Sequence, residues 1–132
     1  KLIVHFQQLS AVPKIMELLD HSDPKIKDAA IYSLGKLEAH EGEARIMEIF
    51  PVQATPVKIR LLEALGNIRS GNNLDFLTEQ FLVSREFSLT KAAGCALVCQ
   101  PGFHLNTTLH VEELTMQQQA ILRHCMNSFI RN

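Results

Sequence analysis

Three cysteines are the residues whose types and spacing come closest to a metal site. Cys95 and Cys99 are four residues apart, so on a helix they would share one face. Cys125, His104 and His124 could lie nearby, and zinc accepts thiolate and imidazole ligands. Buried free cysteine is, however, also a common small core residue. We favour the core interpretation, so that no metal and no other cofactor is predicted.

Other signatures of catalysis are missing from the sequence. No nucleophile stands in a recognisable strand-to-helix elbow, and no glycine-rich phosphate loop is present. We therefore predict that the chain is not an enzyme. Three cysteines make an odd and sparse set, which argues against a disulfide framework and favours a reducing compartment. The expected location is the cytoplasm, with the soluble part of a membrane-anchored protein as the alternative.

The charge balance and the lengths of the apolar runs argue against nucleic-acid binding and against membrane insertion. The 132 residues include 13 lysines and arginines against 14 aspartates and glutamates, a formal net charge of -1, with no basic block. A sequence-independent nucleic-acid binder needs a basic surface, so nucleic acid is not an expected partner. No apolar run approaches the roughly 20 residues that span a bilayer, so membrane insertion by this segment is not expected either. The length suits one domain, residues 1–132.

The sequence repeats with a period of about 31 residues, within the range that helical repeat architectures use. Residues 14–19 (KIMELL) return as residues 45–50 (RIMEIF), and a weaker copy occupies residues 76–81 (FLTEQF). A second motif lies between these copies, at residues 26–37 and again at residues 57–68, with a degraded third copy further along. Its apolar residues fall at three- and four-residue steps, which line one face of a helix. Each repeat is therefore predicted to be a pair of helices.

Helix start signals agree with this repeat. Asp23-Pro24 and Thr55-Pro56 each place a capping side chain before a proline that suits the first turn of a helix. A single helix pair cannot bury its apolar faces alone, whereas several stacked pairs form one continuous core. The expected fold is therefore all-α.

The motif at residues 23–35, with its second copy at residues 55–66, resembles the HEAT repeat. The short period is similar to that of phycobilisome-lyase-type HEAT repeats. The resemblance covers about residues 10–100. It implies a right-handed α-α superhelix, a HEAT-like solenoid of about three helix pairs.

The two ends depart from the repeat. By the same offset, residues 1–8 correspond to the tail of a truncated repeat helix, so we expect the chain to be the C-terminal part of a larger protein. After the repeats of residues 10–100, residues 101–111 are predicted to form an irregular link. Residues 112–130 are predicted to form a capping helix that covers the apolar helix around Cys95.

One set of charged residues recurs with the repeat. Glu17, Glu48 and Glu79 occupy the same position in successive copies, and Lys14 and Arg45 stand beside the first two. In HEAT-like stacks the helices that carry them line the concave side, so the resemblance implies a charged concave binding surface. The alternative is a solvated helix face, where glutamate is simply a good helix former.

These observations predict a non-catalytic protein–protein interaction or scaffold module with a protein or peptide partner. They do not predict its oligomeric state. The alternative is an accessory domain of an enzyme or membrane protein whose active part lies upstream. A metal-binding HEAT-like enzyme is the least favoured class. Deoxyhypusine hydroxylase, a HEAT-like protein, binds iron through several His-Glu pairs inside its repeats, whereas the single pair His40-Glu41 falls in a link between the predicted helices.

Overall fold

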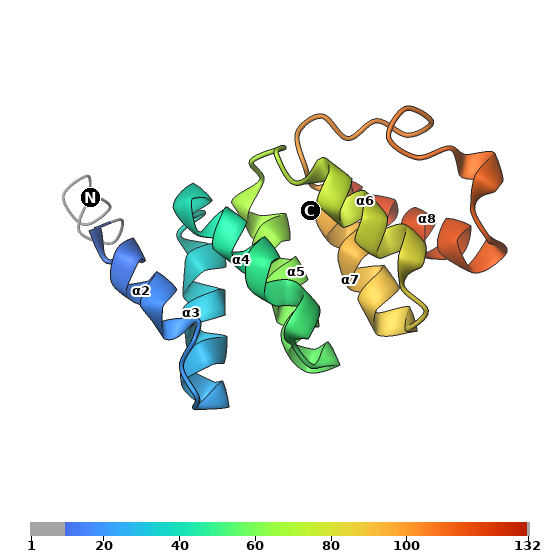
Figure 1. Ribbon diagram of the computed structural model, residues 1–132. Coiled ribbons are helices and arrows are strands. Elements are labelled where there is room, and N and C mark those ends of the chain that lie inside the picture. Colours follow the sequence, from blue (N-terminus) through green and yellow to red (C-terminus); the bar gives the residue numbers. More distant parts are fainter. Residues whose placement is uncertain (1–9, 132) are drawn as a thin grey trace. The chain divides into compact units, whose positions relative to one another are not determined.

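The computed structural model describes residues 10–131, and no strand occurs in that part of the chain (Figure 1). The prediction of an all-α fold is confirmed. The α-helices are α2 (Val12–Leu18), α3 (Pro24–Lys36), α4 (Glu43–Ile49), α5 (Thr55–Ile68), α6 (Leu74–Val83), α7 (Phe87–Val98) and α8 (Met116–Arg131). Short 3-10 helices are η1 (His40–Gly42), η2 (Phe50–Val52) and η3 (Val111–Glu113). The predicted tail at residues 1–8 lies outside the described residues.

The helix boundaries follow the period of the sequence. Val12, Glu43 and Leu74, the first residues of α2, α4 and α6, follow one another at the same offset as the sequence repeat. The first residues of α3 and α5 have this offset too, and α7 begins one residue later than the offset predicts. Each repeat therefore supplies a shorter helix followed by a longer one.

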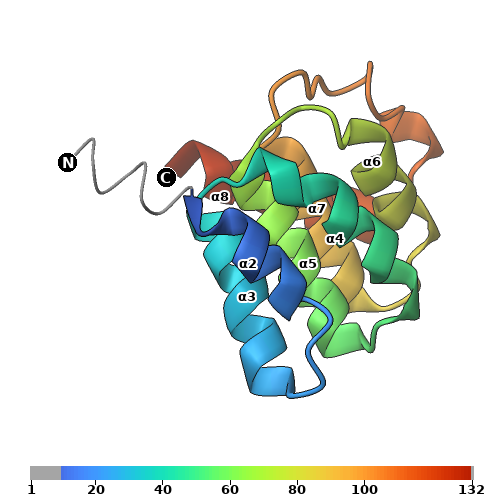
Figure 2. The same cartoon turned by 60° about the vertical axis from the view of Figure 1, so that its left-hand side comes forward.

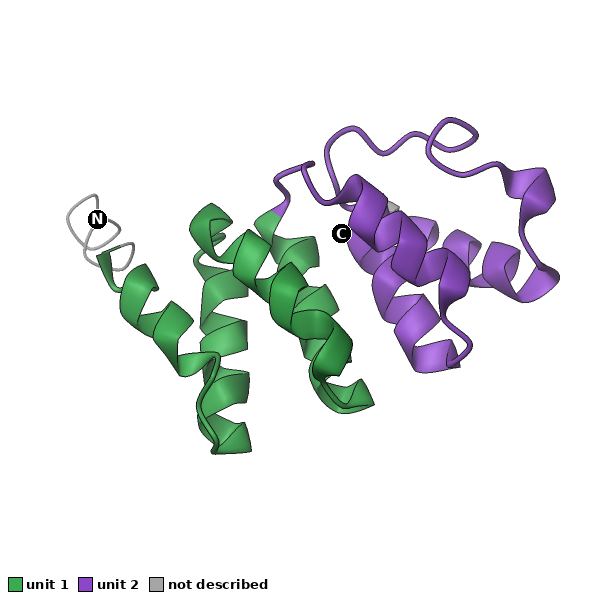
Figure 3. Cartoon of the chain, in the orientation of Figure 1, with its two compact units in different colours: residues 1–68 green, residues 69–132 purple. Residues whose placement is uncertain are grey.

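The contacts within the chain group into two compact units, residues 1–68 and residues 69–132 (Figure 3). In the first unit, α3 packs against both α2 and α5, and α4 packs against α5 (Figure 2). Leu34 of α3 and Leu65 of α5 stand at equivalent repeat positions, and both are fully buried. The apolar face that the sequence predicts is thus buried at Ala30 and Leu34 of α3 and at Leu61 and Leu65 of α5, whereas Ile26 and Ala29 at the start of α3 are exposed.

A glycine sets the distance between α3 and α5. A Cβ atom placed on Gly35 would lie only 3.1 Å from the Cα atom of Ala64, which is backbone and cannot easily move away. Two small residues therefore let the helix backbones approach closely. This contact explains why a glycine follows Ser33 and Leu34 in α3.

We expect Gly35→Leu to lower the free energy of unfolding by about 2–3 kcal/mol, since the new side chain would overpack the contact between α3 and α5. Urea unfolding followed by circular dichroism measures the change. Ala29→Leu is the matched control, because Ala29 is exposed on the same helix, and it should change stability by less than about 0.5 kcal/mol. Equal effects of the two substitutions would contradict this interpretation of Gly35.

Both ends of α3 carry local signals. At its start, the Asp23 carboxylate accepts a hydrogen bond from the backbone N–H of Lys25 at 2.9 Å, as the sequence predicted. At its end, the N–H of Ala39 donates to the carbonyl of Leu34 and the N–H of Glu38 donates to the carbonyl of Gly35. This is the Schellman pattern, and it requires a left-handed residue at Glu38, whose φ is 50°.

Glu38 occupies a position that glycine adopts without strain. We expect Glu38→Gly to raise the free energy of unfolding by about 0.5–1 kcal/mol, because the left-handed backbone disfavours a side chain. Glu63 instead lies at an exposed helical position in the middle of α5. Glu63→Gly should therefore lower the free energy of unfolding by about 1 kcal/mol, because glycine disfavours the helical conformation. Chemical denaturation of both variants tests the pair, and a loss of stability in Glu38→Gly would contradict the assignment.

In the second unit, α7 packs against both α6 and α8. Ala93 and Leu97 on α7 are fully buried, and on α8 the apolar side chains of Ile121, Leu122 and Cys125 are buried. Phe129, near the end of α8, is 44% exposed. The last helix therefore covers the apolar surface of α7 through the middle of its length, at Ile121, Leu122 and Cys125.

α8 begins at Met116, four residues later than the sequence suggested. The Thr115 hydroxyl accepts a hydrogen bond from the N–H of Gln118, and the Gln118 side-chain oxygen accepts one from the N–H of Thr115. This reciprocal capping box fixes the start of the helix. The residues before it form the separate η3 turn, so the irregular segment extends beyond residue 111.

Candidate functional site

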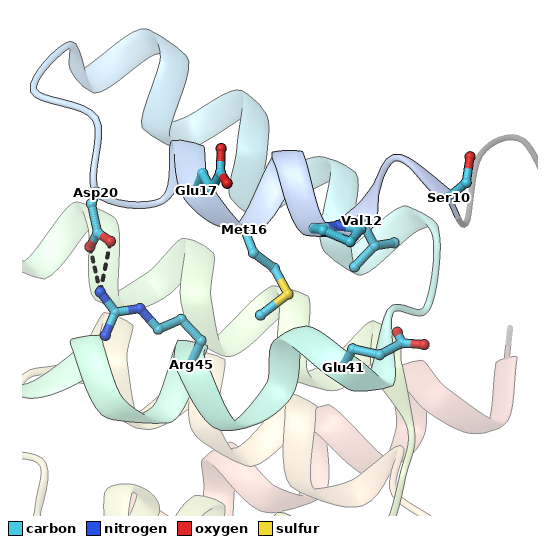
Figure 4. Close-up of a pocket in the computed structure, with 8 residues that line it drawn as sticks. Ser10, Val12, Met16, Glu17, Asp20, Glu41 and Arg45 are labelled. Atoms are coloured by element: carbon cyan, nitrogen blue, oxygen red, sulfur yellow. Dashed lines mark hydrogen bonds and ion pairs between the residues drawn. The ribbon is translucent and has the colours of Figure 1, made fainter.

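A groove of about 520 Å³ lies in the first unit, between α2 on one side and η1 and α4 on the other (Figure 4). It combines an apolar floor with charged side chains. Its lining residues are Ser10, Val12, Pro13, Met16, Glu17, Asp20, Glu41 and Arg45.

The first two turns of α2 supply the floor. Val12 is buried, and Pro13 stands in the first turn, where its missing N–H costs no helical hydrogen bond. Met16 is half-buried and extends from α2 towards α4 (Figure 4). A methionine side chain is unbranched and polarisable, so it can adjust to ligands of different shape.

Arg45 links the two sides of the groove. One guanidinium nitrogen donates to both Asp20 carboxylate oxygens, at 2.7 and 2.8 Å, and another donates to Glu48 at 2.8 Å. The hydrogen bonds with Asp20 and then with Glu48 raise the pKa of Arg45 above its ordinary value. All three side chains contact solvent, so these pairs orient Arg45 more than they stabilise the fold.

Two further carboxylates of the groove remain available. Glu17 on α2 and Glu41 on η1 are exposed, and neither side chain makes a hydrogen bond or ion pair with residues 10–131. Three carboxylates and one guanidinium thus line the groove, which gives it a negative formal charge. A cationic group that enters the groove would not have to displace any of residues 10–131 from Glu17 or Glu41.

The surface predicted from the repeat is brought together only in part. Glu17 and Arg45 line the groove, and Glu48 contacts it through Arg45. Lys14 is exposed on α2 but does not line the groove, and Glu79 is exposed on α6 in the other unit. Whether these five residues share one concave surface therefore stays a prediction.

The repeat gave no indication of the other groove residues. Asp20 follows the end of α2 and meets Arg45 from 25 residues away, a pairing that no periodic signal contains. Glu41 stands in the link between two predicted helices. Met16 belongs to the repeated segment of residues 14–19, but the repeat assigned it no part in a binding surface.

The cysteines lie in the second unit and are free. Within residues 10–131, no three His, Cys, Asp or Glu side chains are placed to share a metal ion. The neighbouring Cys125 thiol on α8, followed by the charge of Lys91, lowers the pKa of the Cys95 thiol on α7 to about 7. Interaction with Cys95, together with burial, raises the pKa of Cys125. Burial also raises the pKa of Cys99.

We expect these pKa shifts to separate the reactivities of Cys95 and Cys99. The thiolate is the reactive form, so alkylation of Cys95 by iodoacetamide should be half-maximal near pH 7. Cys99 should react appreciably only above pH 9, because its pKa lies above the ordinary value of 9.0. Mass spectrometry of the chain alkylated between pH 5 and 10 measures both profiles, with Cys95→Ser and Cys99→Ser identifying each signal. Coincident profiles would contradict the expectation.

No family model, no curated protein and no solved structure matches this chain. Among the residues described, no helix has the length and apolar character that crossing a membrane requires. The chemistry of the groove is therefore the basis for assigning a function.

Proposed function

We propose that this chain is a non-catalytic protein-interaction module built from HEAT-like helix pairs. Its groove between α2 and α4 would bind a peptide segment in which a basic residue stands next to an apolar residue. The main support for this proposal is that one groove combines an apolar floor with two carboxylates that have no partner among the described residues. The regular spacing of α2, α4 and α6 along the chain supports the HEAT-like assignment.

The floor favours an apolar side chain of the partner. Above the buried Val12, Pro13 and Met16 present carbon and sulfur atoms to the groove. Removing such surface from water is the main source of binding free energy. The adaptable Met16 suits an aliphatic residue of variable shape. Affinity would therefore come chiefly from the apolar residue of the peptide.

The charged residues of the groove favour a basic partner. Glu17 and Glu41 come from α2 and η1, so a lysine or arginine side chain in the groove has one carboxylate available from each of these two elements. Arg45 is already held by Asp20 and Glu48, which limits its attraction for an acidic peptide. Exposed charges of this kind govern orientation and encounter rate, and salt screens them.

Fluorescence polarisation with labelled ten-residue peptides tests the proposal. We expect peptides with a Lys-Leu or Arg-Leu pair to bind, and counterparts with Glu in place of the basic residue not to bind. Raising the ionic strength should weaken binding because the carboxylates are exposed. The double variant Glu17→Lys, Glu41→Lys should weaken it by at least about tenfold, a change of about 1.4 kcal/mol.

Two further variants locate the binding surface. Met16→Asp should abolish binding by placing a charge on the floor, whereas Glu79→Lys, outside the first unit, should leave the affinity unchanged. Circular dichroism spectra of all variants control for folding. Failure of every basic-apolar peptide to bind, or an equal loss of affinity in Glu79→Lys, would refute the groove as the binding site.

A further inference from the structure

We propose that Cys95 and Cys125 form a peroxide-sensitive dithiol site, in which Cys95 is the thiolate that is oxidised and Cys125 is the thiol that resolves it into a disulfide. The disulfide would join α7 to α8. The site lies entirely in the second unit and does not depend on the groove described above.

Packing of α8 on α7 brings the two thiols together. Cys125 is buried, and its sulfur lies 3.6 Å from the carbonyl oxygen of Lys91, one helical turn before Cys95. The same sulfur lies 3.5 Å from where a Cβ atom of Gly94 would stand. It therefore lies directly against the turn of α7 that ends at Cys95, and the influence of Cys125 on the pKa of Cys95 agrees with this proximity.

The surroundings give the two thiols different roles. Cys95 is half-buried, so a small oxidant can reach it more readily than it can reach Cys125. The single S–H of Cys125 can donate either to the carbonyl of Lys91 or to a thiolate at Cys95, and Lys91 adds a positive charge nearby. A thiolate at Cys95 is thus stabilised, while Cys125 keeps its proton.

Cys99 does not share this environment. It follows Cys95 by one helical turn, but burial raises its pKa, and the nearby charge of Arg69 only partly offsets that effect. Its thiol is therefore protonated at neutral pH, and a protonated thiol is a poor nucleophile. Cys99 is consequently the internal control for the site.

The oxidation proceeds in two balanced steps with hydrogen peroxide as the oxidant. The Cys95 thiolate attacks one peroxide oxygen, the O–O bond breaks, and the departing hydroxide takes a proton from solvent, which leaves a sulfenic acid on Cys95. The Cys125 thiol then transfers its proton to the sulfenic hydroxyl of Cys95 as its sulfur attacks the Cys95 sulfur, so that a thiolate forms only during the attack, the S–O bond breaks and the hydroxyl leaves as water. Two thiols and one peroxide become one disulfide and two waters.

Peroxide treatment of the intact chain followed by peptide mapping tests the proposal. Trypsin leaves Cys95 and Cys99 together in residues 92–123 and Cys125 in residues 124–131, so fragmentation of the linked peptides must identify the bonded cysteine. We expect a Cys95–Cys125 disulfide that dithiothreitol reverses. A disulfide that uses Cys99, or preferential oxidation of Cys99, would overturn the proposal.

Four variants assign the roles. Cys125→Ser should accumulate a Cys95 sulfenic acid that dimedone traps, because the resolving sulfur is gone. Cys95→Ser should leave Cys125 reduced, and Cys99→Ser should behave like the unmodified sequence. In Cys125→Ala, which also removes the hydrogen-bond donor, the pH of half-maximal Cys95 alkylation should move upwards towards 9. An unchanged alkylation profile in that variant would refute the contact between the thiols.

Discussion

The first unit depends on the close approach of α3 and α5 at Gly35 and Ala64. α2 packs on α3 and α4 packs on α5, so the distance between the two longer helices also sets the distance between the two shorter ones. The groove occupies the space that this arrangement leaves between α2 and α4. A larger side chain at the α3–α5 contact would thus affect both stability and the shape of the candidate site.

Electrostatics then distinguish the residues of the groove from one another. Arg45 and Asp20 neutralise each other across it, and Glu48 accepts a further hydrogen bond from the arginine. Glu17 and Glu41 keep their charge available for a ligand. Because all of these groups are exposed, their contribution is to selectivity and encounter rather than to folding.

The second unit uses a related packing principle for different chemistry. Gly94 on α7 leaves space beside the ring of Phe81 and the sulfur of Cys125, just as Gly35 leaves space beside Ala64. There the close approach brings a buried thiol against the turn that carries a second thiol. Helix packing in one unit forms a groove, and in the other it forms the candidate dithiol site.

The sequence alone determined the helical class, the regular spacing of the helices and the cap at Asp23, because these depend on residues within a few positions of one another or on a pattern that recurs along the chain. It did not reveal the late start of α8, which depends on the capping box of Thr115 and Gln118. Only the tertiary structure placed Asp20 against Arg45 and Cys125 against α7, across 25 and 34 residues. Such pairs depend on which faces of two helices meet and on the distance between the helices. The periodicity of residues along one helix does not specify that distance.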